Sequence, residues 1–455
     1  MQLEFLGHAG FIITQGNTRV ACDPWLSSRG AFHASWFQFP CNHHLWQRDY
    51  CDLTAVVLTH EHPDHLDADF LTHKLPPGIP VVIPLHSSRN LRQAIRNACA
   101  NPIVEVKPGT DHSVGEGVRV LFTPGDTPDS HGSAATFRTR EAVVINMSTA
   151  LLTLKKQQAL KDRVGGVGGR IDAVLVRCAG VNWHPLCYRY SDERIAALAT
   201  GKRVAHLEEA YKTLDRLAPR IGLPCIGPPA FLEDSLFRHN DDLGGKSLVP
   251  DQKRSQDWLR QRGYGRRLEI PLPGDRLNLI NGEFIPDQRI RQEFSFDRTD
   301  MYLKAYAERT RPAITAYLAG LPQPTGDLFE SFRAHVQRLG ESHESVRNQI
   351  EMEFRFVVEG RHAGDFLVRC HAGELTVEST EGQSAPFTVR MDAVWLNQIM
   401  NHNLPWRDFF LSLRFSVEHN PEVKDDHMSS WLKLADVQGS AEPASAIPTE
   451  NPAHA

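Results

Sequence analysis

The stretch Thr59–Asp67, THEHPDHLD, gathers three histidines and three acidic residues directly after the apolar run LTAVVL. Residues two apart at a strand end point to the same side, so His60 and His62 can converge on one ion. Where the chain then turns into a helix, Asp64 and His65 can bind a second ion. Imidazole and carboxylate together suit iron, zinc or manganese. The alternative is a polar loop whose histidines only cap a helix, but four potential ligands in six positions favour one or two divalent metal ions.

The elements that would position this motif form an α/β pattern. The first 240 residues alternate short runs rich in Val and Ile, such as TAVVLTH, IPVVIP and DAVLVR, with stretches of helical spacing, such as DADFLTHKL and ERIAALATGKRVAHLEEAYKTLDRLA. Residues from about 241 to 290 are polar and rich in Gly and Pro and read as a connecting region with some helix, and we expect the first domain to span residues 1–285. This pattern predicts a layered α/β metal domain with large sheets.

The remaining residues predict a second domain and a tail. Residues 286–350 read as a helical linker region. Residues 351–435 contain alternating runs, among them GDFLVRCHAG, ELTVEST and PFTVRMDA, which predict a β-meander with helices in an α+β domain. Residues 436–455 contain no large apolar residues beyond single Val and Ile, so we expect a disordered tail.

Composition excludes several classes of protein. The 455 residues are 41% hydrophobic and 23% charged, with a net charge of −5, which is typical of two or three globular domains and gives no polycationic face for nucleic acid. No apolar run reaches the roughly 18 to 20 residues of a membrane span, and the N-terminus does not read as a signal peptide. Eight scattered cysteines without a CxxC pair predict reduced thiols and a cytoplasmic location.

The HxHxDH motif resembles that of the metallo-β-lactamase superfamily, which implies an αββα sandwich. A longer resemblance, to the CMP-N-acetylneuraminate hydroxylases, rests on GHAGFIIT, CDPWL, AFHASWFQFP, LTHEHPDHLD, the helical run with its PPAFLED turn, and LNQIMNHNLPWRDFFLSLRFSVEHNPEV. It implies a non-haem iron hydroxylase or monooxygenase, with His8 and Asp23 near the metals. The C-terminal domain resembles a sterol-carrier-protein-like fold, in which Trp395, Trp406, Phe409 and Phe410 would line a cavity or, as we favour, fill the core.

The chain departs from these families in two ways. Rieske centres need two Cys-x-His or Cys-x-x-His ligand pairs, which the sequence lacks, so electrons would come from a separate electron-transfer protein. In TPGDTPDSHGS, Asp126 occupies the place of the usual third histidine, and His131 could substitute for it. VVINMSTA has no bridging carboxylate. This oxygen-rich set favours iron, with zinc or manganese as alternatives.

Three further residues are candidates for the site. AGVNWHPLCYRY follows the strand DAVLVR, so His184 and Tyr188 could contact substrate at the strand ends. Glu233, in PPAFLED, falls where a late metal ligand often arrives in this superfamily. The alternatives are a packed loop for the first two and a solvated acid for Glu233.

Three functions follow. A metal-dependent hydroxylase, with Asp64, His184 and Tyr188 in catalysis, is favoured by the longer resemblance. A hydrolase of an ester, lactone or phosphodiester is the alternative, and a non-catalytic binding protein is opposed by the intact HxHxDH. The substrate would be a small molecule. A nucleotide sugar is implied only by the resemblance, since no GxxxxGK[ST] phosphate loop is present.

Overall fold

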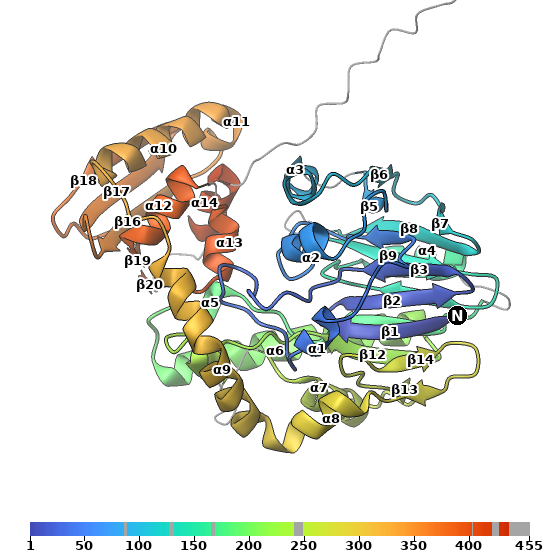
Figure 1. The fold of residues 1–455 in the computed structure, drawn as a ribbon. Helices are drawn as coiled ribbons and strands as arrows, with labels where there is room; N and C mark the ends of the chain where they lie inside the picture. The colour runs from blue at the N-terminus through green and yellow to red at the C-terminus, as the bar shows by residue number, and fades with distance from the viewer. Residues whose placement is uncertain are drawn as a thin grey trace, which may run out of the picture.

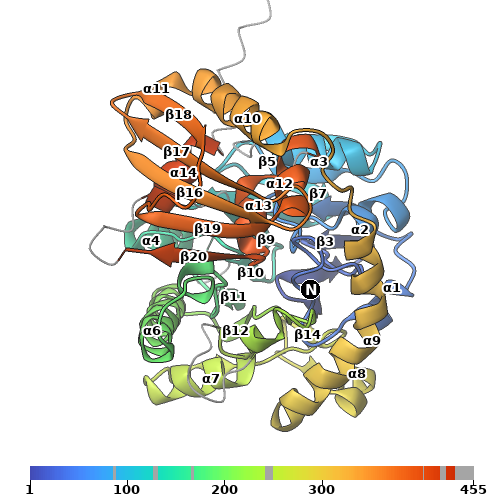
Figure 2. The same ribbon diagram turned by 90° about the vertical axis from the view of Figure 1, so that its left-hand side faces the viewer.

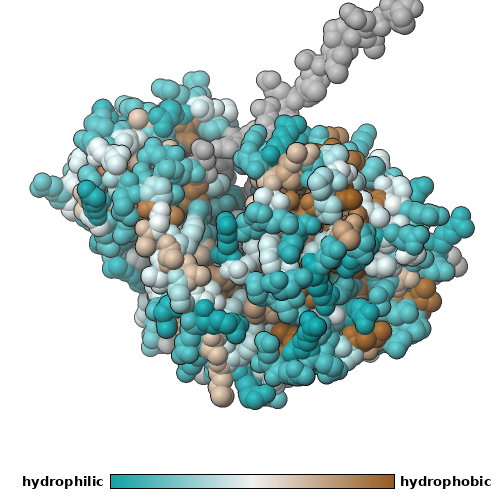
Figure 3. Space-filling view, in the orientation of Figure 1, coloured by the Kyte–Doolittle hydropathy of each residue, from teal (hydrophilic) through white to brown (hydrophobic). Residues whose placement is uncertain are grey.

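The computed structural model describes residues 1–85, 89–126, 132–164, 169–240, 249–402, 404–420 and 427–435. The expected tail, residues 436–455, lies outside this part of the chain. Among the described residues, no helix is long and apolar enough to cross a membrane. Figure 3 shows a face on which hydrophilic residues predominate and hydrophobic residues are interspersed. The predicted α/β class is confirmed, since two large sheets and their helices make up most of the molecule (Figure 1).

The first sheet has eight strands in the order β15-β14-β1-β2-β3-β4-β5-β6. Its N-terminal strands pair antiparallel, whereas β3 to β6 run parallel. The inner parallel strands β4 and β5 are apolar and fully buried, as expected for a sheet covered on both faces, whereas the edge strand β6 is only partly buried. The strands are β1 (Gln2–Gly7), β2 (Gly10–Gln15), β3 (Thr18–Cys22), β4 (Ala55–Val57), β5 (Val81–Pro84), β6 (Ile103–Val106), β14 (Arg276–Asn278) and β15 (Phe284–Ile285).

The second sheet has seven strands in the order β13-β12-β11-β10-β9-β8-β7. It packs face to face on the first sheet through a shared apolar core, in which the rings of Phe11 and Phe137 lie 5.4 Å apart. The strands are β7 (His112–Gly115), β8 (Val118–Pro124), β9 (Ser133–Arg138), β10 (Val143–Asn146), β11 (Ala173–Arg177), β12 (Ile221–Ile226) and β13 (Arg267–Leu268).

Helices cover the outer faces of both sheets (Figure 1). Phe70 and Leu91, on the helices over the first sheet, share a core with Val56 of β4. Leu160 and Leu214 share another core with Val174 of β11. Helix, sheet, sheet and helix layers therefore form an αββα sandwich. The covering helices are α2 (Ala68–His73), α3 (Arg89–Ala98), α4 (Leu154–Val164), α6 (Asp192–Leu217) and α7 (Gln252–Gln261).

The C-terminal part adds a five-stranded sheet, in the order β18-β17-β16-β19-β20, with helices on one side (Figure 2). Trp406, Phe409, Phe410 and Trp431 are all buried, and Trp406 is in ring contact with the other three, so these aromatic side chains fill its core. The elements are α10 (Leu328–Ser342), α11 (Glu344–Arg347), β16 (Met352–Glu359), β17 (Gly364–His371), β18 (Glu374–Ser379), β19 (Phe387–Asp392), α12 (Ala393–Asn401), α13 (Trp406–Leu411), β20 (Phe415–His419) and α14 (His427–Ala435).

Between the two parts lie α8 (Gln288–Glu293) and α9 (Thr299–Ala319), in the region expected to be a helical linker. Leu303 and Tyr306 of α9 are buried with Phe37 and Phe39 of the N-terminal part. Phe332 of α10, in contrast, belongs to the core of the five-stranded sheet. The region between the predicted boundaries at residues 285 and 350 therefore contains helices that pack on two different cores.

Candidate metal centre

The HxHxDH loop leaves the end of β4, a strand with no exposed residues, and is held firmly at both ends. At its start, the Asp23 carboxylate accepts hydrogen bonds from the Thr59 backbone N–H at 2.9 Å and the Thr59 hydroxyl at 2.7 Å. At its end, Asp67 caps α2 by accepting from the Phe70 N–H. The histidines thus lie in a loop that is hydrogen-bonded to the rest of the fold at both ends.

The two histidines nearest the strand face each other. His60 Nε2 lies 3.1 Å from His62 Nδ1, while His60 Nδ1 lies 3.0 Å from the Thr59 hydroxyl. Ligands of one transition metal each sit about 2.0–2.1 Å from the ion, so two neighbouring ligand nitrogens come within this kind of separation. The arrangement of His60 and His62 therefore suits a shared ion, as the spacing of the motif predicts.

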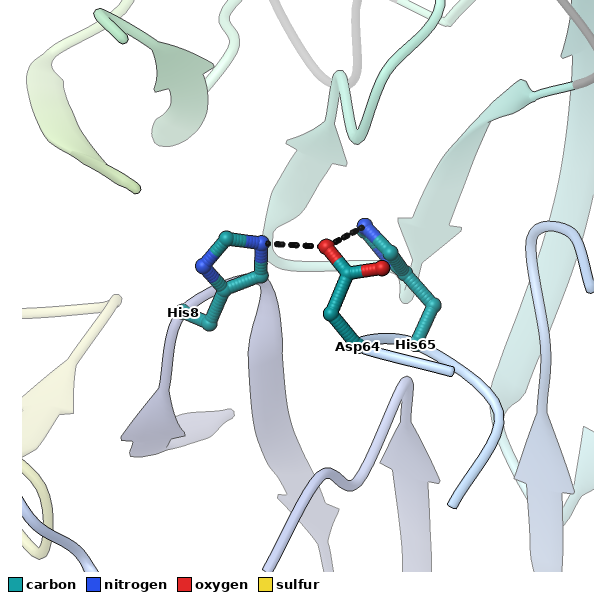
Figure 4. A group of neighbouring side chains, drawn as sticks. All are labelled: His8, Asp64 and His65. Carbon is teal, nitrogen blue, oxygen red and sulfur yellow. Dashed lines mark ion pairs between the residues drawn. The ribbon is translucent and has the colours of Figure 1, made fainter. Parts of the chain in front are cut away.

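The second half of the motif meets a residue from the turn between β1 and β2. The side chains of His8, Asp64 and His65 are buried and point toward one another (Figure 4). The Asp64 Oδ2 atom lies 3.0 Å from His8 Nε2 and 3.6 Å from His65 Nε2. Within the described ranges, these three residues form the one group of three or more His, Cys, Asp or Glu ligands whose atoms all lie within 4.8 Å of one another.

The hydrogen bonds around this cluster fit a divalent metal. His65 Nδ1 lies 2.9 Å from the Asp23 carboxylate, which fixes the ring so that Nε2 faces the cluster. Among the described residues, His65 Nε2 and Asp64 Oδ1 are buried atoms with no hydrogen-bond partner. Unpaired buried polar atoms are rare in native proteins because they lose their hydration without compensation. A metal ion bound by His8, Asp64 and His65 would remove that cost.

The electrostatics keep this carboxylate ionised. Burial alone would raise the pKa of Asp64, but the neighbouring His65 and His8 hold it well below its usual range. Burial likewise opposes protonation of His65, yet the carboxylates of Asp64 and Asp23 raise its pKa. The cluster thus has an anionic oxygen beside two imidazoles, which is a donor set that attracts a cation.

Oxygen groups from the end of β10 approach the histidines from the other side. The Ser148 hydroxyl lies 2.9 Å from that of Thr59, and the Thr149 hydroxyl lies 3.4 Å from His60 Nε2. Ser148 is itself oriented by a hydrogen bond from its N–H to the Asn146 side chain. These residues occupy the place expected for a bridging carboxylate.

The structure does not bring the other predicted ligands into the cluster. The Asp126 carboxylate accepts from the Lys156 ammonium and from the Thr153 N–H, both at 2.5 Å. Glu233 accepts hydrogen bonds from the guanidinium of Arg414. The predicted ligand His131 lies outside the described residues.

A cavity of about 310 Å³ opens beside the cluster. His8, His62 and Asp64 line it, together with Arg177 at the end of β11 and Arg407 from the C-terminal part. Trp183 also lines it, whereas the neighbouring His184 packs its ring edge-on against Tyr188, with centroids 4.7 Å apart.

His8 is the cluster residue that the motif itself did not include. It lies in the turn Gly7–Gly10, with a left-handed φ of 52°, and Gly7 has a φ of 116°. This turn places the histidine at the same sheet edge as the end of β4. The signal available in the sequence was a histidine in a tight GHAG turn between two apolar runs.

Comparison with known proteins supports this description. Residues 18–221 match the family described as a β-lactamase superfamily domain. A protein of Mycolicibacterium smegmatis, provisionally named a Rieske 2Fe-2S iron-sulfur protein, is 25% identical over 432 residues, which cover 91% of this chain and 81% of that protein.

Two solved structures also align with the chain. CmlA, a diiron β-hydroxylase from Streptomyces venezuelae, is 18% identical, with coverage of 60% of this chain and 53% of CmlA and a TM-score of 0.39. An isothiocyanate hydrolase from Delia radicum gut bacteria is 13% identical, with coverage of 61% and 98% and a TM-score of 0.39. TM-scores this low carry no argument about chemistry. The family match, which spans HxHxDH, identifies residues 18–221 as a domain of the metallo-β-lactamase-fold superfamily, a superfamily of metal-dependent enzymes.

Proposed function

We propose that the protein is a non-haem iron hydroxylase or monooxygenase, similar in sequence to the CMP-N-acetylneuraminate hydroxylases. The observation that carries this proposal is the buried group of His8, Asp64 and His65. Two imidazoles and one carboxylate are the ligand set of many non-haem iron(II) oxygenases. The facing nitrogens of His60 and His62 offer a place for a second ion.

Iron held by these residues would supply the redox chemistry that oxygen activation requires. The chain's own residues orient and protect that ion. Asp23 fixes the His65 ring, and Asp64 supplies the anionic oxygen between His8 and His65. The hydroxyl of Thr149, close to His60, can hold a proton at the edge of the cavity.

Electrons would come from a separate electron-transfer protein. The 455 residues contain one cysteine with the spacing of a Rieske ligand pair, Cys41 before His43 and His44, but not the two pairs that a Rieske centre needs, whereas the mycobacterial relative carries Rieske in its provisional name. The alignment leaves about a fifth of that relative unmatched. All eight cysteines of this chain are free, which supports a reducing compartment and hence a cytoplasmic location.

The substrate proposed for this site is a small molecule that carries a negative charge. The cavity beside the metal cluster is of a size that small-molecule sites commonly have. Arg177 and Arg407 both line it, and guanidinium groups are well suited to carboxylate and phosphate. A nucleotide sugar satisfies this description. His184 and Tyr188 lie next to the lining residue Trp183, and their contact with substrate stays a prediction.

A hydrolase is the second candidate. The pairing of His60 with His62 next to a buried carboxylate cluster could hold two zinc or manganese ions, which can lower the pKa of a bound water. The two functions differ in what they consume, because only the hydroxylase uses dioxygen and electrons.

Activity with and without oxygen separates the two functions. CMP-sugars, acyl esters, lactones and phosphodiesters would be incubated with the iron-loaded protein in air and under strict anaerobiosis. We expect one turnover when the reduced protein meets oxygen, and sustained turnover only when a reductant is added. Full activity under anaerobiosis with no reductant would contradict the hydroxylase and support the hydrolase.

A further inference from the structure

The loop of residues 30–36, GAFHASW, which we call the aromatic loop, has an unusual backbone. Its ends are closed by hydrogen bonds between Ala31 and Trp36. Between them, Phe32, His33 and Ala34 have φ values of 47°, 60° and 59°. Residues with a Cβ rarely adopt the left-handed conformation, and three in succession are rarer still. Contacts from outside the loop must therefore hold it in this shape.

Those contacts come from Arg414, which directly precedes β20 of the C-terminal sheet. Its guanidinium donates to the carbonyl oxygens of His33 at 2.7 Å and Phe32 at 3.4 Å, and to the Ser35 hydroxyl. On its other edge it donates to the Glu233 carboxylate. The Arg414 side chain is only 5% exposed. A planar group with five donors can make this set of bonds at once, whereas a lysine cannot.

The aromatic loop also reaches the metal centre. The Phe32 ring packs edge-on against the imidazole of His62, with centroids 5.9 Å apart. It also lies tilted against the Trp36 ring, with centroids 4.5 Å apart. Trp36 is tied in turn to the C-terminal part, because its indole N–H donates to the Leu411 carbonyl at 2.9 Å. Phe32, Trp36 and His62 all line the cavity.

We propose that Arg414 is a positioning residue for the metal site: it fixes the aromatic loop so that Phe32 holds the His62 imidazole in its metal-binding orientation. The C-terminal domain would then complete the metal site without providing a ligand. This inference rests on the metal-binding part of the proposed function and is independent of which reaction the metal catalyses.

Cobalt(II) binding to the full-length apoprotein tests the inference, with visible absorption as the readout of ligand geometry. We expect Arg414→Gln and Phe32→Ala each to weaken cobalt binding about tenfold and to change the cobalt spectrum, as loss of groups that orient a ligand does elsewhere. The matched control is Arg355→Gln. Arg355 also binds a carboxylate with two nitrogens, that of Asp365, in the same domain but within its sheet. We expect the control to keep the wild-type affinity and spectrum.

The outcomes separate this inference from the function on which it rests. A wild-type affinity and spectrum in Arg414→Gln would overturn it, and so would an equal change in Arg355→Gln. If Arg414→Gln fails to fold, Phe32→Ala decides, because it leaves the guanidinium in place, and a wild-type spectrum there also overturns the inference. If His62→Ala binds cobalt as the wild type does, His62 is not a metal ligand and this inference falls, while the group of His8, Asp64 and His65 that carries the proposed function stays untouched.

Discussion

At the scale of single residues, Asp64 has the properties expected of a metal ligand. One oxygen of its carboxylate faces two imidazoles, and the other oxygen is buried without a hydrogen bond among the described residues. In a surface ion pair, water would form hydrogen bonds to such an oxygen. The combination of burial, charge and an unpaired atom is what a metal ligand requires.

Replacement of Asp64 by asparagine should therefore remove the metal and keep the fold. Asparagine has nearly the same shape but cannot offer an anionic oxygen to a cation, so we expect the metal content to fall by about one ion per chain. Elemental analysis of the purified variant measures the loss, and circular dichroism checks the fold. The control is Asp69→Asn, which removes an aspartate paired with the exposed Arg29. A wild-type metal content in Asp64→Asn would refute the ligand role.

The sequence predicted this site unevenly. His60, His62, Asp64 and His65 are close in the chain, and the periodicity of a strand end is enough to predict that they converge. The approach of His8 depends on the pairing of β1 with β2 and on the position of their turn beside β4. That approach is tertiary information, which local spacing does not contain.

At the scale of elements, Asp67, the last residue of the stretch THEHPDHLD, has a structural role beside the metal ligands. Its carboxylate caps α2 through Phe70 and also accepts from the N–H groups of Leu26 at 2.8 Å and Ser27 at 2.7 Å. Burial raises the pKa of Asp67, and these three backbone donors partly oppose that shift. The residue joins α2 to the loop after β3 and does not face the metal cluster.

Replacement of Asp67 by alanine should thus destabilise the protein without removing its metal. Loss of a helix cap and of two further hydrogen bonds to a buried carboxylate should lower the free energy of unfolding by about 2–4 kcal/mol. Urea denaturation of the metal-loaded protein measures the change. A variant with normal stability and no metal would instead make Asp67 a ligand.

Elements inside strongly apolar or periodic runs followed from the sequence, and short strands inside a polar stretch did not. The runs TAVVLTH and DAVLVR contain β4 and β11, and the long helical pattern after residue 191 is α6. The polar stretch near residues 276–285 gave no strand signal, yet β14 and β15 extend the first sheet beside β1. Unlike β4, which lies in a longer apolar run, β14 and β15 have too few residues for a pattern of their own to show.

At the scale of the whole molecule, the C-terminal domain belongs to the site. Arg407 and Leu411 line the cavity beside the metal cluster, and Arg414 holds Glu233 and the aromatic loop. Glu233, which the superfamily pattern suggested as a metal ligand, is placed at this interface. Its partner is distant in the chain, so the sequence alone could not show the pairing.

Metal analysis of the protein purified without oxygen, together with its electronic spectrum, tests the central claim most directly. We expect one or two iron ions per chain, a spectrum that changes when oxygen is admitted, and loss of the ion bound by His60 and His62 in the His60→Ala, His62→Ala double variant. The facing nitrogens of these histidines, and the neighbouring cluster with Asp64, are the basis of that expectation. Two zinc ions per chain and no response to oxygen, or an iron content in the double variant equal to that of the wild type, would contradict it.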